Sequence, residues 1–256
     1  MTSFLVRSED GTPIAFTRTG TGPPVVLVGG GLDDGAENAP LAAALSPWFT
    51  VVNYARRGRG ASGDTKPYAV ERELDDLAAL LATVSGPAHL FGASSGGALA
   101  LRAAAAGLPV ARVAVYEVPY LVDPAVRAAW LSYVDELERL LSADRRGDAV
   151  AAFMRLAGSG EAEITAARAA PVWPALEALA PTLAYDAACL GDGRVPTTPL
   201  TQPVLVATGA ADPFFTPAAD ALTEALPSAT RLVLNHPGHV PDPTLLAPLL
   251  RDFYLS

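Results

Sequence analysis

The sequence predicts an α/β protein built on a mostly parallel, eight-stranded sheet with helices on both faces. Short runs rich in β-branched residues alternate with longer segments whose apolar residues recur at helical spacing. Several of the short runs, such as PPVVLVGGG (23–31), are apolar throughout, as expected of strands buried on both faces. The alternation stops between residues 121 and 200 and then resumes. This interruption predicts an insertion within the sheet-forming chain.

The first two expected strands, 4–8 and 14–20, flank the turn signal EDGTP and predict a hairpin. The other expected strands are 23–28, 49–55, 87–93, 110–118, 202–210 and 230–236. Helices are expected between them at about 36–46, 68–84, 96–107 and 216–226, with a last one ending near residue 254. Strand and helix in this order predict parallel pairing, because each helix carries the chain back across the sheet.

Residues 121–200 contain only helical patterns, which lie at 124–143, 147–158 and 171–191. The segment is too long for an ordinary crossover and too apolar for a disordered linker. We therefore expect two domains: an α/β core formed by residues 1–120 and 201–256, and a helical cap formed by residues 121–200.

The composition excludes several classes of partner and site. The 256 residues carry a net charge of -9, which argues against nucleic acid or an anionic membrane as partner. No stretch approaches the roughly 20 uninterrupted apolar residues of a spanning helix, and the N-terminus lacks the pattern of a secretory signal. We expect a soluble cytoplasmic protein. Cys189 is the single cysteine, so an internal disulfide is excluded and a Cys-based metal site is disfavoured.

The motif that carries chemistry is GASSG (92–96), which matches G-x-S-x-G between an expected strand and an expected helix. A strand that turns directly into a helix strains the residue at the apex and brings the residues two before and two after it close together. Both must be small, and Gly92 and Gly96 meet this condition for Ser94. Ala93 and Gly97 meet it for Ser95, so the spacing leaves both serines possible. The expected length of the strand places Ser94 at the apex and Ser95 at the helix start, where its N–H can bind an oxyanion.

A serine nucleophile needs a base, normally an imidazole oriented by a carboxylate. Asp212 follows the expected strand 202–210, and His239 lies in the loop Pro237–Pro241 after the last strand. His236 lies near the end of the last expected strand, where a structural role beside the site is expected rather than the role of the base. His89 is expected to be an ordinary strand residue. The sequence therefore predicts Ser94, Asp212 and His239 as the catalytic residues.

The order serine, aspartate, histidine and the arrangement of expected elements resemble the α/β-hydrolase fold family, with a helical cap after the sixth strand. The segment RRGRGASG (56–63) resembles the RxGxGxS segment of that family, where the arginines are expected to brace loops. The resemblance implies a second oxyanion donor in the loop after strand 23–28. Many members have His-Gly there, whereas this chain has three glycines at 29–31. Gly31 is the preferred donor and Leu32 the second choice.

Glu117 is a rival to Asp212. It ends the expected strand 110–118, where some relatives of this fold hold the acidic residue. We prefer Asp212 as the acidic residue. Measuring the activity of Asp212→Asn and Glu117→Gln variants distinguishes the two candidates.

The residues predict two-step acyl transfer without a metal or an organic cofactor. An Ala-, Leu- and aromatic-rich cap favours a small hydrophobic substrate, whose scissile group is an ester, a lactone or a thioester. The resemblance also covers cofactor-free perhydrolases. A further alternative is a non-hydrolytic protein on the same scaffold, such as a cyclase, an isomerase or a ligand-binding protein.

Overall fold

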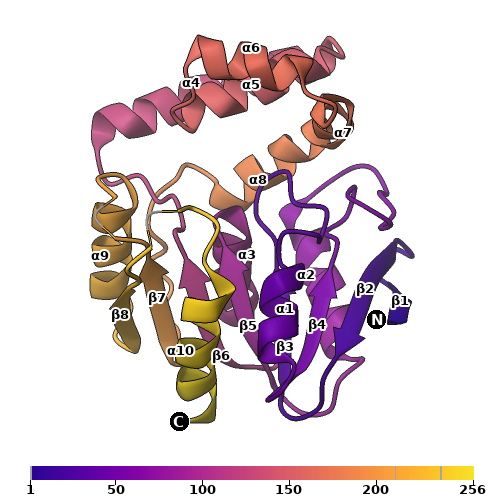
Figure 1. The fold of residues 1–256 in the computed structure, drawn as a ribbon, viewed down its shortest axis with the longest axis vertical. Helices are drawn as coiled ribbons and strands as arrows, with labels where there is room; N and C mark the ends of the chain where they lie inside the picture. Colours follow the sequence, from indigo (N-terminus) through magenta and orange to yellow (C-terminus); the bar gives the residue numbers. More distant parts are fainter. Residues whose placement is uncertain (1, 211, 237) are drawn as a thin grey trace.

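The computed structural model describes residues 2–210, 212–236 and 238–256, and these form an eight-stranded sheet with helices around it (Figure 1). Pro237, in the expected histidine loop, lies outside the described residues. The strands are β1 (Thr2–Arg7), β2 (Pro13–Thr19), β3 (Pro24–Val28), β4 (Thr50–Tyr54), β5 (Ala88–Ala93), β6 (Val110–Tyr116), β7 (Val204–Thr208) and β8 (Ala229–Val233). Their spatial order is β1-β2-β4-β3-β5-β6-β7-β8, with antiparallel pairing at β1·β2 and β2·β4 and parallel pairing elsewhere. The predicted fold class is confirmed.

Two layers of helices cover the sheet. The core helices are α1 (Ala39–Leu45), α2 (Val70–Leu81), α3 (Ser95–Ala105), α9 (Phe215–Ala225) and α10 (Pro243–Leu255). Helices α1 and α10 pack against one face, and α2, α3 and α9 pack against the other. Strands β3, β5 and β7 are buried along their whole length, which explains their continuous apolar sequences. No helix in the described part of the chain is long and apolar enough to cross a membrane.

The register of the parallel strands brings three functional segments to one edge of the sheet. The pairs nearest that edge are Val28↔Gly92, Ala93↔Tyr116 and Tyr116↔Ala207. The residues that follow these strands therefore emerge side by side. They include the glycine loop after β3, Ser94 after β5 and Glu117 after β6.

Between β6 and β7 the chain forms the helical insertion, in which residues 121–200 are all described and contain no strand. Its helices are α4 (Pro124–Ser142), α5 (Arg146–Leu156), α6 (Glu161–Ala169), α7 (Trp173–Leu179), the 3-10 helix η1 (Ala180–Thr182) and α8 (Leu183–Leu190). Figure 1 shows α4, α5 and α6 above the sheet, while α8 descends to the core and packs against α3. The sequence did not single out α6. The division into a core domain and a cap domain stays a prediction.

Candidate active site

Ser94 lies at the apex of the sharp turn between β5 and α3. Its backbone has φ 53° and ψ -127°, a strained combination for a residue with a side chain. A Cβ at Gly92 would overlap the backbone of Gly96, and a Cβ at Gly96 would overlap the carbonyl oxygens of Val28 and Gly29. Both positions therefore require glycine. Ser95 is instead the first residue of α3.

His239 is paired with Glu117. Its Nδ1 lies 2.6 Å from Oε2 of Glu117, and because a carboxylate only accepts, Nδ1 carries the proton and donates it. The other oxygen, Oε1, accepts from the N–H of Gly209 at 2.8 Å. The Glu117 side chain is only 3% exposed, whereas that of His239 is 48% exposed, so the carboxylate is shielded from water while the imidazole is accessible. With the proton on Nδ1, the neutral form of His239 carries its lone pair on Nε2.

The loop that carries His239 is held in place by contacts that the sequence did not indicate. Phe215 stacks on the imidazole with ring centroids 4.8 Å apart and an angle of 11° between the planes. The hydroxyl of Tyr116 donates to the carbonyl oxygen of Gly238 at 2.7 Å. Nε2 of His236 lies 3.0 Å from the carbonyl oxygen of Val240, so His236 supports the loop, as expected of a structural neighbour. The imidazole orientation thus has support from both β6 and α9.

Asp212 does not form the predicted pair with His239. Its Oδ1 accepts from the backbone N–H groups of Phe214 (2.7 Å) and Phe215 (2.9 Å), and its carbonyl oxygen accepts from Thr216. These bonds satisfy the free N–H groups at the start of α9, which is the task of a helix-capping residue. The carboxylate that is hydrogen-bonded to His239 is therefore Glu117, the rival named from the sequence, and not the preferred Asp212; which of the two acts in catalysis stays a matter for the proposal below.

The glycine loop after β3 packs directly against Ser94. A Cβ at Gly30 would lie 3.2 Å from Cβ of Ser94. A Cβ at Gly31 would lie 3.4 Å from Oδ2 of Asp186 and 3.5 Å from Cζ of Phe153, both of which belong to the helical insertion. The loop is thus enclosed between the turn at Ser94 and the insertion.

Asp33 explains why this loop begins with glycine. A Cβ at Gly29 would overlap Oδ2 of Asp33, so the carboxylate of Asp33 fills the space that a side chain at position 29 would need. Oδ1 of Asp33 accepts from the N–H groups of Gly35 (2.8 Å) and Glu37 (3.1 Å) and closes a tight turn. Leu32 adopts φ 58°, so the chain reverses within a few residues of Gly31.

The model of a known family matches this chain over most of its length. That family is described as the alpha/beta hydrolase family, and the match covers residues 25–249. The chain belongs to the alpha/beta hydrolase family. This confirms the resemblance inferred from the sequence.

Individual relatives of this hydrolase agree with its assignment to the alpha/beta hydrolase family. The crystal structure of an alpha/beta hydrolase from Sphaerobacter thermophilus is 47% identical, covers 98% of this chain and 100% of that chain, and has a TM-score of 0.89. The pimeloyl-[acyl-carrier protein] methyl ester esterase of Stenotrophomonas maltophilia is 33% identical over 87% of this chain and 88% of its own length. An uncharacterized hydrolase of Bacillus subtilis, YraK, is 39% identical over 95 residues, which span 36% of this chain and 35% of that protein.

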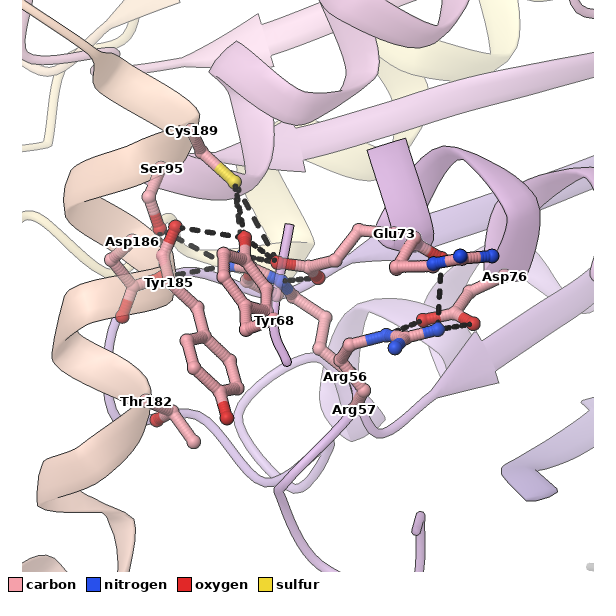
Figure 2. A network of polar contacts seen from close by, with 12 residues as sticks. Arg56, Arg57, Tyr68, Glu73, Asp76, Ser95, Thr182, Tyr185, Asp186 and Cys189 are labelled. Carbon is pink, nitrogen blue, oxygen red and sulfur yellow. Dashed lines mark hydrogen bonds and ion pairs between the residues drawn. The ribbon is translucent and has the colours of Figure 1, made fainter. Parts of the chain in front are cut away.

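A network of buried charges joins the arginine segment 56–59 of this hydrolase to α2 and α8 (Figure 2). Arg56 forms a bidentate pair with Glu73, with both distances 2.7 Å, and also contacts Asp186 of α8. The neighbouring Arg57 points to a different partner and pairs with Asp76 of α2. Arg59 pairs with Asp186 at 2.7 Å. The three arginines are at most 1% exposed and brace loops, as the sequence predicts.

Opposite charges determine which groups of the network are ionised. Burial alone would raise the pKa of Asp186, but Arg59 and Arg56 outweigh it and lower the pKa below its usual range. Burial likewise opposes the charge of Arg56, yet Glu73 and Asp186 raise its pKa well above the ordinary value. For Asp33, burial prevails over its two backbone hydrogen bonds and raises the pKa. The network is therefore charged, while Asp33 is easier to protonate than a free aspartate.

The remaining residues singled out by the sequence are placed as follows. The hydroxyl of Ser95 donates to Oδ1 of Asp186 at 2.7 Å, so it has a structural partner that the sequence did not reveal. His89 is buried, stacks on Tyr254, and has its pKa lowered to about 4, chiefly by burial. Cys189 is also buried, and burial raises the pKa of its thiol to about 12.

Within the described ranges, no group of three or more His, Cys, Asp or Glu side chains is arranged to hold a metal ion.

Proposed function

We propose that this protein is a serine hydrolase that cleaves an ester bond in a small, uncharged, hydrophobic molecule, with Ser94 as nucleophile, His239 as base and Glu117 as the acidic partner. The observation that carries the proposal is the 2.6 Å hydrogen bond between His239 and Glu117 at the sheet edge where Ser94 occupies a strained turn. A buried carboxylate on Nδ1 fixes the tautomer that a general base requires.

The proposed reaction has two steps. Nε2 of His239 takes the proton of the Ser94 hydroxyl as its oxygen attacks the carbonyl carbon, and returns it to the leaving alcohol when the acyl-enzyme forms. In the second step His239 takes a proton from water as the water oxygen attacks the acyl carbon. The bond between that carbon and Oγ of Ser94 then breaks, His239 returns the proton to Oγ, and the acid is released with the enzyme restored. Glu117 stabilises the imidazolium that forms in each step.

The N–H groups of Gly31 and Ser95 are the proposed donors to the oxyanion of the tetrahedral intermediate. Ser95 begins α3, so its N–H belongs to a helix N-terminus, where negative charge is stabilised. Gly31 belongs to the loop that packs against Ser94. A donor of this kind contributes about 3–4 kcal/mol to stabilisation of the transition state.

The surroundings of the site favour an uncharged acyl group. Phe153 offers an apolar surface beside Gly31. Asp33 and Glu37 lie nearby, and the pKa of Glu37 is raised by burial and by the charge of Asp33, whereas His239 lowers it. In their ionised forms these carboxylates would repel an anionic substrate, and burial already disfavours negative charge in this region. The name of the 33% identical methyl ester esterase makes a carboxylic ester the first choice, ahead of a lactone or a thioester.

The test combines covalent labelling with turnover. A fluorophosphonate probe is expected to label the native protein at Ser94, and short-chain p-nitrophenyl esters are expected to be hydrolysed. Ser94→Ala serves as the matched control for both measurements. If neither labelling nor hydrolysis of esters, lactones or thioesters occurs, the hydrolase proposal fails. A cyclase, isomerase or ligand-binding role would then be favoured.

A further inference from the structure

Asp186 brings one carboxylate oxygen of the helical insertion into the interior of the core. Its Oδ1 accepts from Arg56, Arg59 and Ser95, each at 2.7 Å. Asp186 is 6% exposed, so these bonds form away from water and are strong. Figure 2 shows Asp186 on α8 facing Arg56 and Ser95. We call Arg56, Arg59 and Asp186 the charge clamp.

The charge clamp holds the backbone of the glycine loop. Arg59 donates through Nη1 to the carbonyl oxygen of Gly30, and Arg56 donates through Nη1 to that of Gly29 at 3.3 Å. In a trans peptide unit the C=O and the following N–H point in opposite directions. The bond from Arg59 to Gly30 therefore fixes the direction of the Gly31 N–H, in the loop whose Gly30 packs against Ser94.

The charge clamp also reaches the second proposed oxyanion donor. The hydroxyl of Ser95 bonds to the same carboxylate oxygen that Arg56 and Arg59 share. Ser95 is 2% exposed and begins α3, so this bond anchors the first turn of the helix. One carboxylate of the insertion thus connects both loops whose N–H groups face the reacting carbonyl in the proposed mechanism.

We propose that Arg59 and Asp186 are positioning residues for the oxyanion hole, and that through them the placement of α8 controls the rate of the chemical step. This inference rests on the proposed serine-hydrolase function. Neither residue needs to touch the substrate: Arg59 orients and polarises the Gly30–Gly31 peptide, and Asp186 holds Arg59 while it anchors Ser95. Two guanidinium groups face two carboxylates, Asp186 and Glu73, so the clamp adds no net negative charge beneath the oxyanion.

The segment contains its own matched control. Arg57 is also fully buried and ion-paired, but its partners are Asp76 and Asp10, which contact neither the glycine loop nor the insertion. Arg57→Lys and Arg59→Lys are therefore equal chemical changes in equally buried sites. Lysine keeps the charge but cannot reproduce the planar fork with which arginine contacts two acceptors.

The experiment measures kcat, KM, thermal stability and the inhibition constant of an alkylboronic acid, which forms a tetrahedral, negatively charged adduct with serine. Arg59→Lys and Asp186→Asn are each expected to lower kcat about 10- to 100-fold. The inhibition constant of the boronic acid should rise by a similar factor, while KM stays nearly unchanged. Arg57→Lys is expected to lose stability to a similar extent while it keeps the wild-type kcat and inhibition constant.

The outcomes separate this inference from the proposed function. If Arg59→Lys keeps the wild-type kcat and inhibition constant, or if Arg57→Lys loses as much as Arg59→Lys, the positioning role is refuted. Should Arg59→Lys not fold, Asp186→Asn decides in the same way, because asparagine preserves the size of the side chain. If the wild-type protein is not labelled at Ser94 and hydrolyses no ester, the proposed function fails, and the positioning role fails with it.

Discussion

Replacing Glu117 with glutamine tests the assignment of the acidic residue most directly. In the Glu117→Gln variant the amide oxygen would still accept the Gly209 N–H, so the fold around it should be kept. The amide NH₂ of the new side chain, however, would then face Nδ1 of His239 and donate to it. The imidazole would be forced into the tautomer with its proton on Nε2, where it cannot accept the proton of Ser94.

The expected effect is large. Loss of the correct tautomer in a triad of this kind lowers kcat about 10⁴-fold, which corresponds to about 5 kcal/mol of transition-state stabilisation. The assay is steady-state hydrolysis of a short p-nitrophenyl ester, with thermal unfolding measured in parallel to show that the variant is folded. KM should change little, because Glu117 is 3% exposed and does not face the substrate.

Asp212→Asn is the matched control for this prediction. Asparagine is as good a helix cap as aspartate, so the bonds from Phe214 and Phe215 should persist, and kcat and stability should stay near wild type. Asp212→Ala should cost about 1 kcal/mol of stability through loss of the cap. If Asp212→Asn abolished turnover while Glu117→Gln retained it, the geometric reasoning would be refuted and the original preference for Asp212 restored.

Three further predictions concern the turn and the charge clamp. Ser94→Ala should abolish ester hydrolysis and fluorophosphonate labelling. Ser95→Ala should keep more than about a tenth of the wild-type kcat, because the backbone N–H of residue 95 remains. Equal losses in the two variants would contradict the assignment of Ser94 as the nucleophile. Gly96→Ala should destabilise the fold by about 3 kcal/mol in chemical denaturation, because the new Cβ would overlap two carbonyl oxygens, and an unchanged midpoint would contradict this. The pKa of Asp186 is lowered in the folded state, so its contribution to stability is fully present above its unfolded value of about 3.9 and is lost as pH falls through the folded pKa. The stability difference between wild type and Asp186→Asn should therefore be constant from about pH 5 to 9 and shrink below about pH 4, and a difference that grew on acidification would contradict the ion pairing.

Strands β2 and β8 are only partly buried, but the central part of the sheet could be predicted from the sequence because β3, β5 and β7 are buried along their whole length. Such strands are almost entirely apolar; each follows a proline, and β3 and β7 are followed by glycine, so most of their ends are visible in the sequence. Helix α6 was missed for the opposite reason. In Glu161–Ala169 only Ile164 is buried, so no apolar stripe marks the helix.

The turn at Ser94 could be predicted because the steric condition for it is local. It requires two small residues only four positions apart, and Gly92 and Gly96 meet this condition. Asp186 could not be found in this way. It meets Arg56 across 130 positions, and no motif precedes it in the sequence. A carboxylate in an apolar helix is the only local signal, and by itself it does not indicate a partner.

The choice between Glu117 and Asp212 depended on two features that sequence patterns do not contain. Adjacent parallel strands end only about 4.8 Å apart, so a loop returning over this edge can bring its histidine to either strand end. Glu117 leaves β6 with φ 49°, has one more methylene group than aspartate, and is held by the Gly209 N–H of the neighbouring strand's loop. Asp212 lies where α9 begins, and two free N–H groups of that helix already occupy its oxygen. The imidazole requires only a buried acceptor at Nδ1, and Tyr116 and Phe215 hold the loop where Glu117 meets that requirement. The acidic residue can therefore lie after β6 or β7 without a change in the chemistry, and the hydrogen bond between His239 and Glu117 is the observation on which the proposed choice of β6 rests.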